Sequence, residues 1–260
     1  MQRIGVVSGR FPSTRFESPT NHKAYCDLHG YTYIHCNWPT GARNPYMNKL
    51  RYLLSYFDLF DYIFWIDDDA FFLDTERSLD HALPTEDAFL SICASPTNKS
   101  LKTFISSGQF ALRCDERARS FLIETEAMDL DAVRDWWTPE LGFFTNGDQD
   151  AMTYLLKTTF TGQFDLHPHD HFNSRTVDVL DGQWDDVFVV HFTGAPAVKE
   201  QDWRAVQAWM GRPASLLPRP LHDQYHGDPQ SRARRRITPR FVGRAIRSRL
   251  ARAWQRLRGR

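Results

Sequence analysis

The sequence lacks any run of 18 apolar residues, which is about the length that a helix needs to cross a bilayer. Its first residues, MQRIGVVSGRF, contain too short an apolar run for a secretory signal peptide. The four cysteines fit no C-x-x-C metal or redox spacing, so we expect reduced, mostly buried thiols. These absences predict a cytoplasmic protein with no membrane-spanning segment.

The chain also lacks a net charge, but its basic and acidic residues are unevenly distributed along the sequence. Residues 230–260 hold twelve arginines and no acidic residue, which leaves twenty basic and 32 acidic residues in 1–229. Such a split is typical of an interaction tail on a separate catalytic or binding body. We therefore expect one large domain over 1–210, a linker rich in Pro, Arg, Gly and Ser over 211–238, and a basic amphipathic helix over 239–260.

The predicted C-terminal helix has an apolar stripe among its arginines. The stripe consists of Phe241, Ile246, Leu250, Trp254 and Leu257. A stripe that contains Trp favours binding in the headgroup plane of an anionic membrane, because a pure polyanion binder needs no such stripe. Nucleic-acid binding through phosphates and a solvated basic tail are the alternatives. We expect peripheral attachment to the inner face of the plasma membrane.

Strands and helices alternate through the rest of the chain, which predicts an α/β fold. Strands are expected at 3–8, 31–36, 61–67, 88–93, 109–112 and 187–192, and helices at 20–29, from 45 onwards, at 116–127 and at 148–157. Asn44 and Asp115 are expected as N-caps, and Gly30 as a helix stop. Asp148 also lies where an N-cap is expected.

Three carboxylates follow the most apolar of these strands. The five residues between Asp61 and Asp67 leave no polar face, as in a strand buried on both sides. Alternation places Asp67 and Asp69 on one side of the chain and Asp68 on the other. Adjacent acids at a buried strand end need a compensating cation or strong donors. Their oxygens suit Mn²⁺ or Mg²⁺, which can also bind a diphosphate, and an acidic turn without a metal is the alternative.

Six ordered segments within residues 4–195 resemble the motifs of one enzyme family. They are NHKAYC (21–26) with HGY (29–31), NKL (48–50), YIFWIDDDA (62–70), SGQFALR (107–113), GDQDAM (147–152) and VHFTG (190–194). These segments are similar to those of GT-A glycosyltransferases, particularly galactosyl/xylosyltransferase family 34, which contains yeast α-mannan galactosyltransferases and plant xyloglucan xylosyltransferases. The resemblance implies a Rossmann-like fold with a mixed, mostly parallel sheet flanked by helices.

The resemblance also implies a metal site made by Asp67, Asp69 and His191, which would hold Mn²⁺ or Mg²⁺. From the residues alone, a histidine after a buried strand such as 187–190 is more often merely hydrogen-bonded. The implied donor is a nucleoside-diphosphate sugar, with UDP as the expected nucleotide, and the implied acceptor is a glycan or glycolipid. A divalent ion would stabilise the charge that develops on the leaving diphosphate.

The same motifs assign further residues to the donor and the acceptor. Those on the donor side are Lys23, Lys49, Asp67, Asp68, Gly108, Gly194 and Lys199. The family has a lysine soon after its H-F-x-G motif, where this chain has Ala195-Pro196, so Lys199 is a displaced candidate. Asp148 and Gln149 would lie beside the anomeric centre, and enzymes of the family retain the anomeric configuration.

Two other functions stay open at this stage. A non-catalytic sugar- or nucleotide-binding protein on the same fold would be expected to have lost Asp69, His191 or Gln149, and all three are present. A metal-dependent phosphohydrolase would need more clustered ligands, and the segment HPHDH (167–171) keeps this alternative open.

Overall fold

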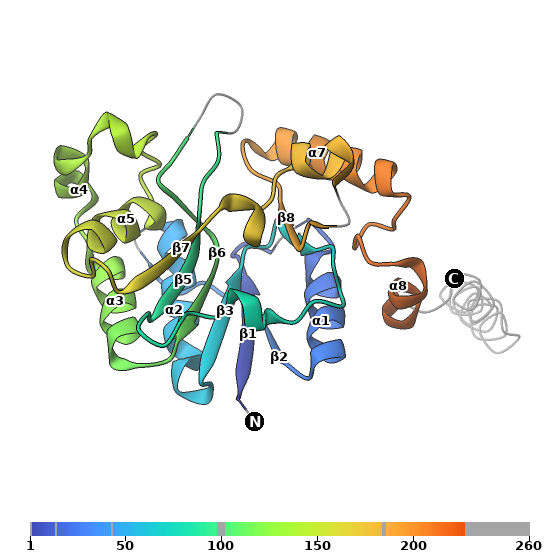
Figure 1. Cartoon of the computed structure of the whole chain (residues 1–260), viewed down its shortest axis with the longest axis horizontal. Helices are drawn as coiled ribbons and strands as arrows, with labels where there is room; N and C mark the ends of the chain where they lie inside the picture. Colours follow the sequence, from blue (N-terminus) through green and yellow to red (C-terminus); the bar gives the residue numbers. More distant parts are fainter. Residues whose placement is uncertain (1, 14, 43, 98–101, 184–185, 227–260) are drawn as a thin grey trace, which may run out of the picture. The chain divides into compact units, whose positions relative to one another are not determined.

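Six strands form the central sheet, in the order β2-β1-β3-β6-β5-β7 (Figure 1). Their bounds are β1 Ile4–Gly9, β2 Thr32–Cys36, β3 Tyr62–Ile66, β5 Leu90–Ala94, β6 Ile105–Arg113 and β7 Phe164–His167. The pairs β1–β2, β1–β3 and β5–β7 are parallel, and β6 runs antiparallel to both β3 and β5. The predicted mixed, mostly parallel α/β sheet is confirmed.

The described part of this computed structural model comprises residues 2–13, 15–42, 44–97, 102–183 and 186–226. Its α-helices are α1 Ser18–His29, α2 Asn48–Tyr56, α3 Glu116–Ala127, α4 Leu130–Trp136, α5 Asp148–Thr158, α6 Thr176–Asp178, α7 Pro196–Met210 and α8 Arg219–His226. Short helical turns are η1 Pro45–Met47, η2 Phe57–Leu59, η3 Leu79–Ala82, η4 Pro139–Leu141, η5 His169–His171 and η6 Val179–Gln183. A further pair of strands, β4 (Ala70–Phe72) and β8 (Val189–His191), forms a separate two-stranded sheet.

Both faces of β3 are buried, which explains the uninterrupted apolar run in its sequence. Ile63 and Trp65 lie in a core with residues of α2, α3 and α5, whereas Phe64 and Ile66 lie in a second core with residues of α1, β4 and β8. Successive side chains of a strand point to opposite faces of its sheet. A strand between two cores therefore has no position for a polar side chain.

Three predicted helix boundaries are confirmed by their hydrogen bonds. Asn44 accepts from the backbone N–H of Tyr46, and Asp115 accepts from that of Ala118. Gly30 ends α1 in the left-handed region, at φ 69°. The prediction of Asp148 as an N-cap is wrong, because Gly147 occupies that position and Asp148 is the first residue of α5.

One face of α1 fixes the backbone that follows the triple acid. Ser18 donates to the carbonyl of Asp68 at 2.6 Å, and His22 Nε2 lies 2.8 Å from the carbonyl of Ala70. Asn21 donates to the carbonyl of Phe72 and accepts from its N–H, at 2.9 and 2.8 Å. These residues are spaced as neighbours on one side of a helix. The turn at 67–69 is thus held between β3 and a β4 strand that α1 anchors.

We expect Asn21→Ala to lower the free energy of unfolding by about 2–4 kcal/mol, because it leaves buried backbone groups of Phe72 without partners. Asn21 also donates to the carbonyl of Ser215 at 3.0 Å, so the change affects two distant segments. Urea denaturation at pH 7 measures the loss. Asp27→Ala, on the exposed side of the same helix, should change stability by less than about 0.5 kcal/mol. Equal stability of the two variants would contradict this role of Asn21.

The chain divides into two compact units, residues 1–218 and 219–260. Leu216 and Leu217 are fully buried in the first unit, and Arg212 donates to the carbonyl of Leu73 at 3.1 Å. The first unit therefore continues through the residues 211–218 that were expected to begin a linker. Helix α8, in the second unit, also lies within the expected linker, and Arg219 pairs there with Asp223 at 3.5 Å.

The predicted basic helix 239–260 lies outside the described residues, so membrane attachment through it stays a prediction. Among the described helices, none combines the length and the apolar character needed to cross a bilayer. All four cysteines have free thiols, and three of them are buried, as the sequence predicted.

Candidate functional site

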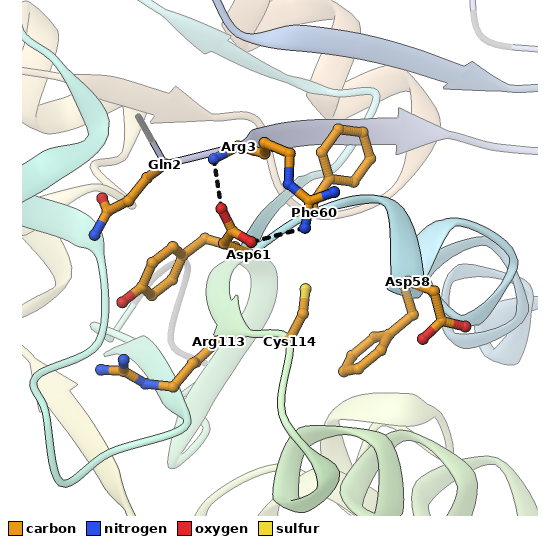
Figure 2. Close-up of a pocket in the computed structure, with 9 residues that line it drawn as sticks. Gln2, Arg3, Asp58, Phe60, Asp61, Arg113 and Cys114 are labelled. Carbon is orange, nitrogen blue, oxygen red and sulfur yellow. Dashed lines mark hydrogen bonds and ion pairs between the residues drawn. The ribbon is translucent and has the colours of Figure 1, made fainter.

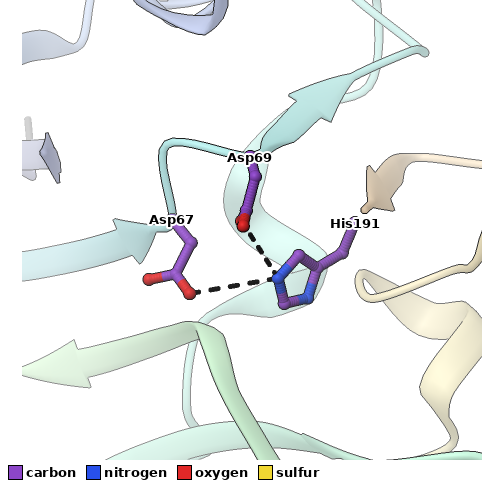
Figure 3. A group of neighbouring side chains, drawn as sticks. All are labelled: Asp67, Asp69 and His191. Atoms are coloured by element: carbon purple, nitrogen blue, oxygen red, sulfur yellow. Dashed lines mark ion pairs between the residues drawn. The ribbon is translucent and has the colours of Figure 1, made fainter. Parts of the chain in front are cut away.

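Two strand ends bring the acidic turn and His191 together. Asp67 follows β3, Asp69 precedes β4, and His191 is the last residue of β8, directly opposite Ala70 in the β4–β8 ladder. His191 Nε2 lies 3.2 Å from Asp69 Oδ1 and 3.9 Å from Asp67 Oδ2 (Figure 3). Ligand atoms of the three side chains all lie within 4.8 Å of one another. Two carboxylate oxygens and one ring nitrogen at this spacing are a donor set that suits Mn²⁺ or Mg²⁺.

The outer oxygen of each carboxylate is held by the protein. Asp67 Oδ1 accepts from the indole N–H of Trp65 at 2.7 Å and pairs with Lys49 Nζ at 3.3 Å. Asp69 Oδ2 pairs with the ammonium of Lys199. The inner oxygens therefore face His191. Among the described residues, Asp69 Oδ1 is buried without a hydrogen bond of ordinary geometry, and its neighbour is His191 Nε2 at 3.2 Å. A buried acceptor of this kind is explained by an ion that would bind to it.

Asn173 and Arg175 orient the ring of His191. Its Nδ1 lies 3.1 Å from Asn173 Oδ1, and that oxygen also accepts from the Arg175 guanidinium at 2.6 Å. Burial lowers the pKa of His191, and the nearby Arg175 lowers it further, although Asp69 and Asp67 act in the opposite direction. The neutral imidazole that a metal requires is therefore favoured.

Positive side chains balance the charge of the acids. Burial by itself would raise the pKa of Asp69, but a protonated His191 and the ammonium of Lys199 both favour the carboxylate and hold that pKa below its usual range. When His191 is neutral, the ammonium of Lys199 still favours the carboxylate. Burial would lower the pKa of Lys199, and the three acids Asp69, Asp67 and Asp68 raise it instead. Asp69 is thus ionised at neutral pH and available to a cation.

A second buried ion pair extends the site towards α5. Lys49 of α2 lies 2.9 Å from Asp148 Oδ2 and donates to the carbonyl of Ser107 at 2.8 Å. Gln149 accepts from the N–H of Ser107 at 3.2 Å. Lys49 also contacts Asp67, so it connects the predicted metal ligands with the two residues predicted beside the anomeric centre.

Gly108 makes room for the ring of His191. A Cβ atom at this position would lie 2.3 Å from His191 Cε1 and 2.8 Å from Nδ1. The carbonyl of Gly108 also accepts from the N–H of Asp67 at 2.8 Å. The predicted donor-side residue Gly108 therefore contacts both the ring and the acidic turn.

We expect Gly108→Ala to weaken Mn²⁺ binding by roughly 10–100-fold, as for other changes that misplace a metal ligand. Titration with Mn²⁺, followed by the loss of the free-ion signal in electron paramagnetic resonance, measures the affinity. Gly162→Ala is the control for a general loss of stability, because Gly162 has a positive φ, so that a side chain strains the backbone, but faces open space. Unchanged affinity in Gly108→Ala would show that the ring position does not matter for the ion.

Three predicted residues are not brought to the three-ligand cluster. Lys23 pairs with Asp27 at 2.7 Å on the exposed side of α1. Asp68 pairs with Arg10, at 3.9 Å. Gly194 is exposed in the connection between β8 and α7, with φ 109°. The other predicted site residues lie in the two connected clusters described above.

Four residues that contact the site or its turn received no role from the sequence: Trp65, His22, Asn173 and Arg175. Trp65 is part of an apolar strand, and its indole N–H donates to Asp67, two residues further along the same side of the chain. Asn173 and Arg175 follow the HPHDH segment and belong to no predicted element. No local pattern marks them, because their partner His191 is 16 to 18 residues further along the chain.

The HPHDH segment is used within the fold. The rings of His167 and His171 stack at 4.4 Å. His167 Nε2 lies 3.0 Å from Ser91 Oγ, and His171 Nε2 lies 3.0 Å from the carbonyl of His81. Among the described residues, Asp67, Asp69 and His191 form the one group of three with metal-ligand spacing. The observation that kept a phosphohydrolase open is therefore accounted for by packing.

A hollow of about 480 Å³ lies at the opposite end of the sheet (Figure 2). Arg3 and Asp61, which precede β1 and β3, form an ion pair there at 2.9 Å. Arg113, at the end of the antiparallel β6, donates to the carbonyl of Thr85 at 2.8 Å. The charged groups of this hollow bind one another, the backbone or, in the case of Asp58, the neighbouring Arg119. Ligands of α/β sheets collect at the carboxyl ends of parallel strands, and Asp67 lies at that end of β3.

Comparison with known protein families shows which family the chain belongs to. The model of the galactosyl transferase GMA12/MNN10 family matches residues 12–202. The chain belongs to this family. Its membership shows that the protein is a glycosyltransferase and confirms the resemblance seen in the six sequence segments. No curated protein matches the chain.

Solved glycosyltransferases share the fold of this family member. A glycosyltransferase involved in the glycosylation of the major capsid of PBCV-1 has 14% identity and a TM-score of 0.57, over 77% of this chain and 98% of its own. GlyE of Streptococcus pneumoniae TIGR4 has 11% identity and a TM-score of 0.50, over 87% of this chain. The match spans 64% of the GlyE chain. At these identities the similarity shows the fold alone.

Proposed function

We propose that this glycosyltransferase is metal-dependent and transfers a hexose or pentose from a nucleoside-diphosphate sugar, with UDP as the expected nucleotide, to a glycan or glycolipid. The observation that carries the proposal is the convergence of Asp67 Oδ2, Asp69 Oδ1 and His191 Nε2. The residues fit a divalent ion because, within the described part of the chain, Asp69 Oδ1 is buried without a hydrogen bond and His191 Nε2 lies 3.2 Å from it. When bound, Mn²⁺ or Mg²⁺ would supply charge stabilisation for the leaving diphosphate.

Lys199 is suited to the same task without a metal bond. It extends from the first turns of α7, and its ammonium reaches the acidic turn. Its raised pKa keeps it charged at neutral pH. In the donor complex this ammonium would pair with a phosphate oxygen, which is the role implied for the family's lysine after H-F-x-G. Lys199 lies further along the sequence than the family's lysine, but helix α7 brings its ammonium to Asp69.

Lys49, Asp148 and Gln149 are suited to the sugar side. Lys49 pairs with both Asp67 and Asp148, so the acid at the start of α5 is held next to the metal ligands. Gln149 is fixed by the backbone of Ser107. We place these groups beside the anomeric carbon of the donor. A retaining reaction would then give an α-linked product from an α-linked donor, and NMR of the purified product tests this configuration.

The test of the proposed function is a screen of nucleotide sugars with and without Mn²⁺. At least one donor should raise the melting temperature of the full chain only when Mn²⁺ is present, since a ligand of the native state stabilises it by mass action. The same donor should release its nucleoside diphosphate. The proposal would be contradicted if no donor raised the melting temperature. A donor that raises the melting temperature but is not turned over in the presence of glycan acceptors would favour a binding protein on this fold.

A further inference from the structure

A buried arginine lies behind the metal-ligand cluster, and no carboxylate of the described residues is in hydrogen-bonding contact with its guanidinium. Arg175 is 5% exposed, and its Nη1 donates to the backbone oxygen of Asn173 at 2.7 Å and to Asn173 Oδ1 at 2.6 Å. Burial lowers the pKa of Arg175 to about 10. A guanidinium can only donate hydrogen bonds, so each atom to which it is hydrogen-bonded must be an acceptor.

The chain brings Asn173 alongside His191 through strand-like pairing. The N–H of Ser174 donates to the carbonyl of Val189 at 3.0 Å, and the N–H of His191 donates to the carbonyl of Ser174 at 2.9 Å. Ser174 therefore forms a parallel β-bridge with Val190. The short turn η5 precedes this pairing, and the N–H of Asn173 donates to the carbonyl of His169 at 2.9 Å. The HPHDH segment therefore positions the residues that follow it.

The contact with Arg175 settles which end of the Asn173 amide faces His191. Only the amide oxygen can accept from the guanidinium, so Oδ1 occupies the shared position. His191 Nδ1 lies 3.1 Å from that same oxygen, and an amide oxygen cannot donate. The ring proton must therefore lie on Nδ1 for this hydrogen bond to form. In the neutral ring, Nε2 then carries the lone pair, on the side that faces Asp69 and Asp67.

We propose that Asn173 and Arg175 are positioning residues that hold His191 as the Nδ1–H tautomer, so that Nε2 is available to a divalent cation. Arg175 orients the amide, Asn173 Oδ1 accepts the hydrogen bond from the ring N–H, and Gly108 gives the ring the space in which to lie. Partners of this kind fix the tautomer and the orientation of metal-binding histidines. The inference rests on the proposed function for the identity of the ion, but the tautomer is a property of the protein alone.

The tautomer is tested directly in the full chain without metal. Long-range ¹H–¹⁵N spectra of protein with ¹⁵N-labelled histidine distinguish a protonated from an unprotonated ring nitrogen, and the missing signals of His191→Gln identify those of His191. We expect protonated Nδ1 and unprotonated Nε2 in the native protein. Asn173→Leu and Arg175→Met should move the proton to Nε2 or give a mixture. Asn173→Asp, which keeps an acceptor, should preserve the native pattern.

Metal affinity provides the second measurement. Asn173→Leu should weaken Mn²⁺ binding by about 10–100-fold, and Asn173→Asp should not. A native His191 protonated on Nε2 would overturn the proposal, as would an unchanged tautomer in both Asn173→Leu and Arg175→Met. If one variant does not fold, the native spectrum and the other variant still decide. An Nδ1–H tautomer in a protein that binds no Mn²⁺ would remove the proposed metal while leaving the positioning role intact.

Discussion

Asp69→Asn is expected to reduce Mn²⁺-dependent release of nucleoside diphosphate by about 10³-fold. The change keeps the shape of the side chain but removes the charge that faces His191 Nε2 at 3.2 Å. A bound metal stabilises the transition state by several kcal/mol. Each 1.36 kcal/mol is a factor of ten in rate, so the loss of about 4 kcal/mol gives this effect. Initial rates at saturating donor, with Mn²⁺ varied, separate weaker metal binding from a slower reaction.

Asp61→Asn is the matched control for this change. Asp61 precedes the strand that Asp67 follows, and its carboxylate pairs with Arg3 at the other end of the sheet. Its replacement should leave the rate within about twofold, because exposed ion pairs contribute little to stability. Native rates in Asp69→Asn would contradict the assignment of Asp69 as a metal ligand.

Lys49→Met is expected to lower the free energy of unfolding by about 3–5 kcal/mol, because it leaves the buried carboxylate of Asp148 and the partly exposed carboxylate of Asp67 without their cation. Such a loss is a large part of the roughly 5–15 kcal/mol that stabilises a typical protein. Burial would lower the pKa of Lys49, but Asp148 and Asp67 raise it. The ion pair is therefore fully present below the unfolded pKa of about 10.4 and is lost only as the pH rises through the higher folded value.

Guanidinium denaturation at pH 7 measures this effect, with two comparison variants. Lys23→Met removes an exposed lysine and should change stability by less than about 0.5 kcal/mol. Lys49→Met combined with Asp148→Asn should be more stable than Lys49→Met alone, because one uncompensated charge is gone. If the single and double variants were equally stable, the proposed charge balance between Lys49 and Asp148 would be wrong.

Sequence patterns predicted the parts of the fold that local chemistry determines. The apolar run 62–66 predicted β3 because both faces of that strand are buried. Capping residues predicted helix starts, since Asn44 and Asp115 bond to backbone within three residues of themselves. The strand β7 and the helix α7 were not predicted. β7 is a half-exposed edge strand of four residues, so it has little apolar character.

The acidic turn of the candidate site was predictable from the residues themselves, because three carboxylates follow a buried strand. His191 was predicted only by resemblance, since it lies 122 positions from Asp69 and shows no periodic relation to it. Asn173 and Arg175 escaped prediction because their roles depend on strand-like pairing with β8, a contact that no local pattern encodes. The N-cap expectation for Asp148 failed for a similar reason, since its carboxylate is used by the distant Lys49.

Anomalous diffraction from crystals of the full chain grown with Mn²⁺ and a nucleoside diphosphate would locate the ion that we assign to Asp67, Asp69 and His191. We expect one manganese peak in contact with the Asp69 carboxylate and His191 Nε2, with the diphosphate bound to the same ion. A diphosphate bound at this turn without manganese, or manganese bound instead at His167 and His171, would contradict this assignment.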